Sequence, residues 1–424
     1  MDRKLTQFSL PQELIDTLID WVQFMRENSD DPLEFTSTLQ SCSLVCKSFL
    51  PRARKYLFHD ITLRSNPGDQ TLDGFKQRIQ PLLEFEDSGL SREVMALVRK
   101  LTICEGPFTR TNWILKDTIH RLLPFGQLPF TTLKEIELGS SRARSSYEVD
   151  AASLSELLKN NFSLESLRLI GVSLNSRSEV IHILSSLSRH THFHRLGLVS
   201  IHIQQYTDTD VMMDTPFDDR PRLTTLEYRN PDDRLLDDLF FDPRSLFDIS
   251  ELKELDLSTQ MKPIPARASE EGGNCSKILA CCPESLTSLC LDIRDFLFTG
   301  LTTMNYLQHV TELRRLELRG LNIRHGWTHQ IAFILTLLSA LPRGLHHLSL
   351  HAEILDWHVL EQFQHLDSVL SALPESLPLK EIRIVLERFG RLIDKETDIE
   401  KIANCFPKTR ERGISIAPER GGRR

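Results

Sequence analysis

The residues best suited to chemistry are three groups of histidines and cysteines. His190, His192 and His194 alternate along the chain, so a strand would place their imidazoles on one face, as a Zn²⁺ or Ni²⁺ site requires. The other two groups are His346, His347 and His351, and Cys275, Cys281, Cys282 and Cys290. The cysteines lack the paired spacing of a structural zinc site, and each group falls at a strand or strand end of the repeats described below. We therefore expect structural positions, no metal and no cofactor.

Motifs of enzymes are missing from the sequence. There is no glycine-rich phosphate loop, no nucleophile elbow and no metalloprotease helix motif. No set of residues offers a nucleophile together with a base and an orienting partner. We therefore predict a protein that binds other molecules and is not an enzyme.

Composition narrows the class of partner. The 424 residues include 51 lysines and arginines and 59 acidic residues, a net charge of −8, whereas nucleic-acid binding usually shows a basic footprint. The longest apolar runs, such as 331–341, are shorter than the ~20 residues of a membrane helix, and the first residues lack a secretory signal. We expect no nucleic-acid or membrane partner, free thiols, and a location in the cytoplasm, the nucleus or both.

A short phrase, apolar-x-x-apolar-x-apolar-x, recurs along the chain and predicts the architecture. Ten copies begin 27 to 35 residues apart. Their first residues are Val98, Leu133, Leu164, Phe193, Leu223, Leu252, Leu286, Leu313, Leu345 and Leu379. The fourth and sixth positions lie two residues apart, so on a strand both point into one core while their neighbours face the other way.

Helical spacing follows several copies, so each repeat predicts one strand and one helix. Such a period is typical of an α/β leucine-rich-repeat solenoid, a horseshoe, over residues 98–408. An α/β sheet whose strands happen to be rich in leucine is the alternative. We expect a connecting segment at 64–97, a C-terminal tail at 409–424, and core positions at Leu255, Leu316 and Leu348.

Residues 8–63 lack the spaced copies and predict a small module of three helices, which makes the whole chain α+β. The first helix follows Pro11, the second runs from about Thr36 to Val45, and the third begins near Cys46 or Phe49. Three short helices bury little surface by themselves. The module therefore needs a partner, either the repeats or another protein.

This segment resembles an F-box, in the form common in mushroom-forming fungi, where it precedes irregular leucine-rich repeats. The resemblance rests on LPQELI at 10–15 and CSLVCKSF at 42–49, and the chain is about ten residues longer than the family pattern between Asp20 and Thr38. The resemblance implies docking onto the Skp-type adaptor of a cullin-based ubiquitin ligase. The matching adaptor-facing positions are Leu10, Pro11, Leu14, Ile15, Ile19, Leu39, Leu44, Val45 and Phe49.

Two functions remain open at this point. The chain is either the substrate receptor of an SCF-type ligase, or a repeat scaffold without a ligase connection whose F-box-like module caps the array. For the receptor, we expect an unknown protein substrate to bind the third, fifth and seventh positions of the phrase, which face away from the core on the concave side. The expected substrate-binding residues are Glu227, Arg229, Glu254, Asp256, Arg315, Glu317, Arg319, His347 and His351.

Overall fold

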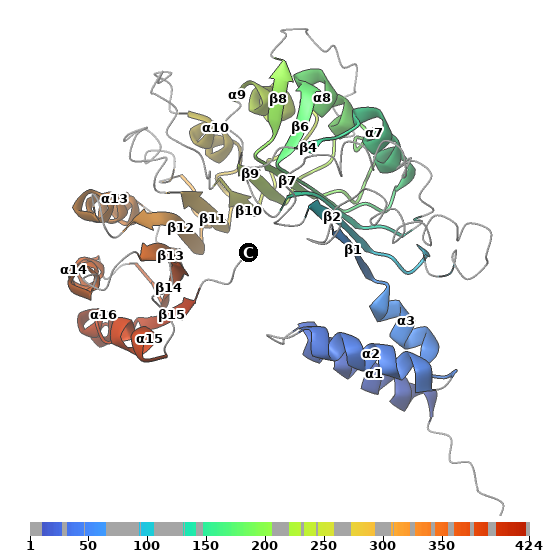
Figure 1. The fold of residues 1–424 in the computed structure, drawn as a ribbon. Coiled ribbons are helices and arrows are strands. Elements are labelled where there is room, and N and C mark those ends of the chain that lie inside the picture. Colours follow the sequence, from blue (N-terminus) through green and yellow to red (C-terminus); the bar gives the residue numbers. More distant parts are fainter. Residues whose placement is uncertain are drawn as a thin grey trace, which may run out of the picture. The chain divides into compact units, whose positions relative to one another are not determined.

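The computed structural model divides into two compact units. The first comprises Met1–Ser140 with Tyr147–Leu167, and the second comprises Ser141–Ser146 with Arg168–Arg424. The structure describes residues 11–27, 32–45, 47–64, 93, 95–105, 130, 132–140, 147–205, 220–229, 233–242, 245–257, 273–292, 307, 309–322, 327–340, 344–354, 360–373, 377–388 and 396–420. Both units mix helices with parallel strands, as Figure 1 shows.

The second unit contains a large parallel sheet whose strands follow one another in chain order. The order is β7-β9-β10-β11-β12-β13-β14-β15, and all seven pairings between these neighbours are parallel. Its strands are β7 (Arg195–Val199), β9 (Thr225–Arg229), β10 (Glu254–Asp256), β11 (Ser288–Asp292), β12 (Arg315–Asn322), β13 (His347–Ile354), β14 (Glu381–Arg388) and β15 (Ser415–Arg420). Strands β6 (Val172–Ser176) and β8 (His202–Gln205) pair separately, also in parallel.

The pairing register reproduces the repeated phrase. Fourth-position residues of successive copies lie opposite one another, as Leu255 does with Leu289, and Leu316 with Leu348. Leu255, Leu316 and Leu348 are all buried, which confirms their predicted inward orientation. Because a slip of one residue would turn every side chain to the other face, the buried leucines specify this register.

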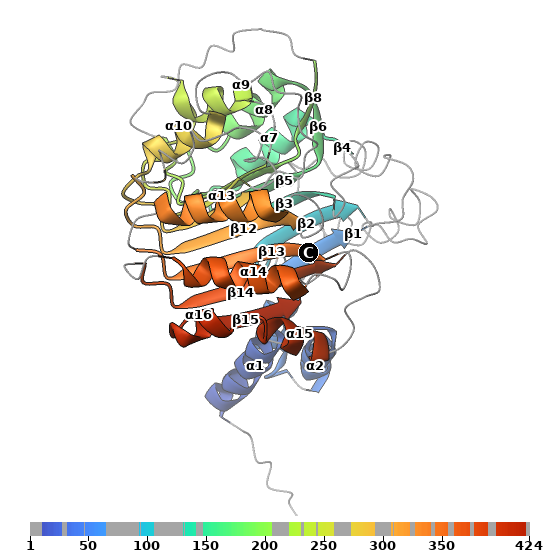
Figure 2. The ribbon, with the colours of Figure 1, turned by 90° about the vertical axis from the view of Figure 1, so that its left-hand side faces the viewer.

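Helices connect the strands of the second unit and cover one face of its sheet. They are α8 (Arg177–Ser185), α9 (Asp233–Leu236) continued by a π-helical turn (Asp237–Phe241), α10 (Gly273–Cys281), α13 (Trp327–Ala340), α14 (Leu360–Ser371), α15 (Glu396–Ala403) and α16 (Pro407–Glu411). Figures 1 and 2 show α13, α14 and α16 on the same side of β12–β15. Within the described residues, each helix is too short or too polar to cross a lipid bilayer.

The C-terminal tail predicted at 409–424 is wrong for residues 409–420. Strand β15 pairs with β14 over six residue pairs, and Asp367 of α14 accepts hydrogen bonds from the backbone N–H (2.8 Å) and the hydroxyl (2.6 Å) of Thr409. The register opposes Ile416 to Ile382 and Pro418 to Ile384. Gly413 and Pro418 thus occupy two of the three apolar positions of the phrase in this strand. For that reason this copy of the phrase was missed in the sequence. Residues 421–424 lie outside the described residues.

The first unit begins with the expected three helices and continues into parallel strands. The helices are α1 (Gln12–Glu27), α2 (Pro32–Val45) and α3 (Leu50–Leu57). They are followed by β1 (Asp60–Arg64), β2 (Lys100–Glu105), β3 (Glu135–Ser140), β4 (Tyr147–Glu148) and α7 (Ala151–Asn160). Strand β5 (Ser166–Ile170) contains the boundary between the units.

Two predicted boundaries of this region need correction. The second helix begins at Pro32, four residues before the expected start, and α1 extends to Glu27, so part of the extra length between Asp20 and Thr38 is helical. Residues 60–64 belong to a strand paired with β2, not to the module or to a connecting segment. This strand carries its own copy of the phrase at Phe58, Ile61 and Leu63, which the helical assignment of 8–63 concealed.

Candidate functional site

The helical module has a small core of its own. Ile15 and Ile19 of α1 and Leu39 of α2 are buried against one another, with Val22, Phe49, Tyr56 and Leu57 packed around them. Ile15, Ile19 and Leu39 were expected to face an adaptor, and this expectation is wrong because they join the helices to each other. Phe49 is half-buried beside the same core.

A second apolar face of the module points to solvent. Seven large apolar side chains are exposed in the described part of the chain, and six of them lie on α1 and α2. They are Leu14, Leu18, Trp21 and Phe24 on α1 and Leu44 and Val45 on α2, with exposed fractions of 52% to 85%. We call these six residues the apolar face.

The apolar face agrees with the predicted adaptor-facing residues only in part. Leu14, Leu44 and Val45 were expected there, and Pro11 is exposed beside them. Leu18, Trp21 and Phe24 were missed, and Leu10 lies outside the described residues. Helical periodicity could have found the first two, because Leu14, Leu18 and Trp21 have the spacing i, i+4, i+7 and lie about 100° around α1 from Ile15, Ile19 and Val22.

Ion pairs hold α1 against α3. Arg52 donates two hydrogen bonds to the carboxylate of Asp20, at 2.7 and 2.6 Å, and the Tyr56 hydroxyl donates to the same carboxylate at 2.7 Å. The hydrogen bond from Arg52 lowers the pKa of Asp20 and outweighs the effect of burial. The charged groups here are therefore engaged within the module, while the side chains of the apolar face are more than half exposed.

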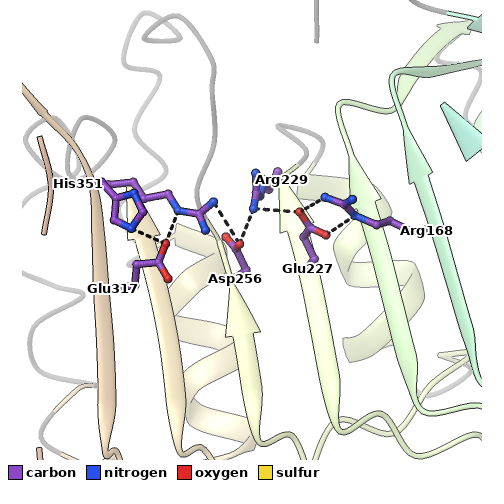
Figure 3. A network of polar contacts seen from close by, with 7 residues as sticks. Arg168, Glu227, Arg229, Asp256, Glu317 and His351 are labelled. Atoms are coloured by element: carbon purple, nitrogen blue, oxygen red, sulfur yellow. Dashed lines mark hydrogen bonds and ion pairs between the residues drawn. The ribbon is translucent and has the colours of Figure 1, made fainter. Parts of the chain in front are cut away.

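Charged side chains of the second unit form a continuous network across the sheet (Figure 3). We call it the charge ladder: Arg168, Glu227, Arg229, Asp256, Arg319, Glu317 and His351. Arg168 donates to both oxygens of Glu227, at 2.7 and 3.0 Å, and Arg229 contacts both Glu227 (2.9 Å) and Asp256 (2.5 Å).

The other end of the charge ladder has the same alternation of sign. Arg319 lies 3.5 Å from Asp256 and 2.6 Å from Glu317, and His351 lies 2.9 Å from the same Glu317 oxygen. Burial alone would raise the pKa of Glu317, but the hydrogen bond from His351 and the charge of Arg319 lower it to about 2. Glu317 therefore stays ionised well into the acid range.

Two small residues let the ladder cross intervening strands. Arg168 of β5 reaches Glu227 of β9 over Gly197 of β7, where an added Cβ would lie 2.7 Å from Cγ of Arg168. Arg319 of β12 likewise reaches Asp256 of β10 across β11. The β11 residue directly opposite Asp256 is Cys290. Cys290 stands at a fifth position of the phrase, which was expected to face away from the core, but its side chain is buried. Burial together with the charge of Asp256 raises the pKa of its thiol.

The predicted substrate-binding residues thus fall into two groups. Glu227, Arg229, Asp256, Glu317, Arg319 and His351 belong to the charge ladder, and their side chains are only 14% to 25% exposed. Glu254, Arg315 and His347 are exposed in the next row along the strands. Arg319 does not add to the positive charge of Arg315, because its acidic neighbours Asp256 and Glu317 neutralise it.

The candidate metal-binding groups do not converge within the described residues, where no cluster of three histidine, cysteine or acidic side chains could hold an ion. His190 is buried while His192 is exposed, and the ring of His194 lies against the carbonyl oxygen of His192 at 2.8 Å. Cys282 is buried in contact with the Ile278 carbonyl oxygen at 3.2 Å. The Cys275 side chain lies outside the described part.

Comparison with known proteins assigns no family to this chain. No protein-family model matches it, and no curated protein sequence matches it. The functional argument therefore rests on the apolar face, the charge ladder and the register of the sheet.

Proposed function

We propose that the protein is the substrate receptor of a cullin-based ubiquitin ligase. In this proposal the α1–α3 module is an F-box that docks onto a Skp-type adaptor through the apolar face, and the sheet with its helices is a leucine-rich-repeat solenoid that binds a protein substrate. The observation that carries the proposal is the concentration of exposed apolar side chains on α1 and α2.

The energetics of exposure favour a partner for this face. Burying an exposed leucine, valine or aromatic side chain is worth about 1.5–3 kcal/mol, and contiguous exposed apolar residues usually mark an interaction site. Trp21 adds the residue type most enriched among the energetically dominant contacts of interfaces. The module's own core uses a different side of α1, about 100° around the helix, so docking through the apolar face would leave its fold intact.

The sheet supports the second half of the proposal. Each copy of the phrase within the second unit's sheet supplies one strand, the strands are parallel, and equivalent positions of successive copies are in register. Stacked repeats of this kind present one row of side chains per phrase position, which suits binding of an extended protein surface. The scaffold alternative, with the module as a cap, would require the repeats to cover the apolar face, whose side chains are exposed within the first unit.

Binding of the purified full chain to a Skp-type adaptor from a mushroom-forming fungus tests the proposal. The double variant Leu14→Asp, Leu44→Asp should bind at least about 100-fold more weakly, because charges would be buried at the contact. The matched control is Phe162→Asp, which changes the seventh exposed apolar side chain, outside the module. Circular dichroism should show that both variants keep the wild-type fold.

Two results would contradict the proposal. One is a wild-type chain that binds no Skp-type adaptor at micromolar concentration. The other is a double variant that binds as tightly as the Phe162→Asp control. Either result would favour the scaffold.

A further inference from the structure

A row of exposed side chains lies beside the charge ladder, at the third position of each phrase. We call it the entry row: Arg195, Thr225, Glu254, Ser288, Arg315, His347 and Glu381. The register places these residues directly opposite one another on seven successive strands. The row is therefore a continuous line across the sheet, with one residue per strand.

Charge along the entry row alternates with small hydroxyl residues. Arg195, Glu254 and Arg315 are exposed, and the half-buried Thr225 and Ser288 stand between them. Beyond Arg315 the next two residues of the row contact each other, because His347 lies 3.1 Å from Glu381. The open part of the row thus carries positive, negative and positive charge on every second strand.

Within the described residues these three charges have no ion-pair partner, unlike those of the charge ladder. No ion pair joins Arg195, Glu254 or Arg315 to another residue of the described ranges, and Glu254 accepts only a long hydrogen bond from Thr225 at 3.4 Å. Arg168, Arg229 and Arg319, in contrast, are all ion-paired. Since exposed unpaired arginines are frequent anchors for carboxylates, the entry row rather than the charge ladder can bind an acidic partner.

The spacing of the charges selects a peptide conformation. Neighbouring strands lie about 4.8 Å apart, so charges on every second strand are about 9.6 Å apart. A polyproline II helix has three residues per turn and rises about 9.3 Å per turn, so its residues i, i+3 and i+6 share one side at nearly this spacing. In a β-strand, residues i and i+3 point to opposite faces and cannot match the row.

We propose that the entry row binds an extended, polyproline II segment of the substrate with the pattern acid-x-x-base-x-x-acid. The acidic side chains contact Arg195 and Arg315, and the basic side chain contacts Glu254. This inference rests on the proposed function as a substrate receptor and deepens it by naming the class of segment recognised. The charge ladder lies beside the row, and because its charges neutralise one another it does not compete for the peptide's charges.

Charge inversion tests the inference directly. The probe is a fluorescent proline-rich heptapeptide with Asp at positions 1 and 7 and Lys at position 4, and fluorescence anisotropy measures its binding to the full chain. The variant Arg195→Glu, Arg315→Glu should bind it at least about tenfold more weakly at 0.1 M salt. The matched control is Arg314→Glu with Arg222→Glu, which makes the same change of charge at two other exposed arginines.

Rescue distinguishes recognition from a general effect of charge. The triple variant Arg195→Glu, Glu254→Arg, Arg315→Glu should prefer the inverted peptide, with Lys at positions 1 and 7 and Asp at position 4, over the original. Equal loss in the control variant, failure of this rescue, or equal binding of a peptide with the charges at positions 1, 3 and 5 would overturn the inference.

Adaptor binding by the same samples separates this inference from the proposed function. Wild-type chain that binds the adaptor but not the heptapeptide overturns the inference and leaves the proposed function standing. Chain that binds the heptapeptide but no Skp-type adaptor supports the entry row as a peptide site and contradicts the ligase assignment.

Discussion

The apolar face of the helical module and the charge ladder of the sheet both depart from the usual distribution of side chains, in which apolar residues are buried and charged residues are exposed. In the module, large apolar residues such as Trp21 and Leu44 are exposed. In the sheet, charged residues such as Arg229 and Glu317 are largely withdrawn from water. The first arrangement leaves apolar surface exposed, as docking in the proposed function requires, whereas the charges of the second are paired with one another.

This difference shows that residue type alone does not identify a binding surface. Arginine and glutamate on a strand face suggest a binding site when each is considered alone, but the three arginines of the ladder contact carboxylates at 2.5 to 2.7 Å. In a largely buried ion pair each charged side chain is stabilised by the other, and removing one of them leaves the other charge uncompensated. Mutations in the ladder should therefore damage the fold, and mutations in the apolar face should damage binding.

The largest expected contrast lies within a single helix. Leu39→Ala removes a fully buried side chain of α2 and should reduce the free energy of unfolding of the module by about 2–5 kcal/mol. Leu44→Ala, on the same helix and 85% exposed, should change it by less than about 0.5 kcal/mol. Hydrogen exchange of the α2 amides measures both, and similar costs for the two variants would mean that the apolar face is not free.

Acid should weaken the sheet through Glu317. Its pKa is lowered from 4.5 to about 2 in the folded chain, so its ion pairs stabilise the fold fully above about pH 4.5, and this stabilisation is lost as the pH falls towards 2. The shift corresponds to at most about 3 kcal/mol. Glu317→Gln should be less stable than wild type at pH 7, and the difference should shrink as the pH falls to 2. A difference independent of pH, from urea unfolding at each pH, would contradict this role.

A smaller effect is expected where Arg168 crosses β7. In Gly197→Ala the new methyl group would meet Arg168 and lie 3.4 Å from Oε2 of Glu227, so the ion pair must shift at a cost of about 1–2 kcal/mol. In the background Arg168→Ala the same substitution should cost almost nothing. A double-mutant cycle from urea unfolding measures this coupling, and additive costs would show that Gly197 does not serve the ladder.

Much of the sheet could be predicted from the sequence, because burial of the fourth and sixth positions imposes a fixed pattern of apolar residues. Leu255, Leu316 and Leu348 follow from that pattern alone. Strand β15 could not be predicted, because proline and glycine replace two apolar residues of the phrase: Pro418, which lies opposite Ile384, and Gly413, two residues before the strand. A strand at the end of the described sheet has one neighbour instead of two, and proline is tolerated there.

The candidate site was less predictable, for two physical reasons. Helix α1 is apolar on two sides, and periodicity does not say which side packs against α2, so Ile15 and Ile19 were assigned to the partner instead of the core. On the sheet, the phrase predicts which side chains leave the core but not how far they reach. Only the register shows that Arg168 and Glu227 meet across a glycine.

The smallest expected effect concerns the ion pair between α1 and α3, which resembles the charge ladder in geometry but not in burial. Asp20 and Arg52 form two hydrogen bonds, yet their side chains are 42% and 31% exposed, against 25% and 17% for Glu317 and Arg319. Exposed pairs are screened by water and salt and contribute up to about 1 kcal/mol. Asp20→Asn should therefore lower the free energy of unfolding by less than 1 kcal/mol, and 0.5 M NaCl should reduce the difference further. Glu317→Gln should keep most of its cost at that salt concentration, because its partners are less hydrated. Equal salt sensitivity of the two variants in urea unfolding would show that the ladder is as exposed as a surface pair, and the distinction between the two regions would then rest on the apolar face alone.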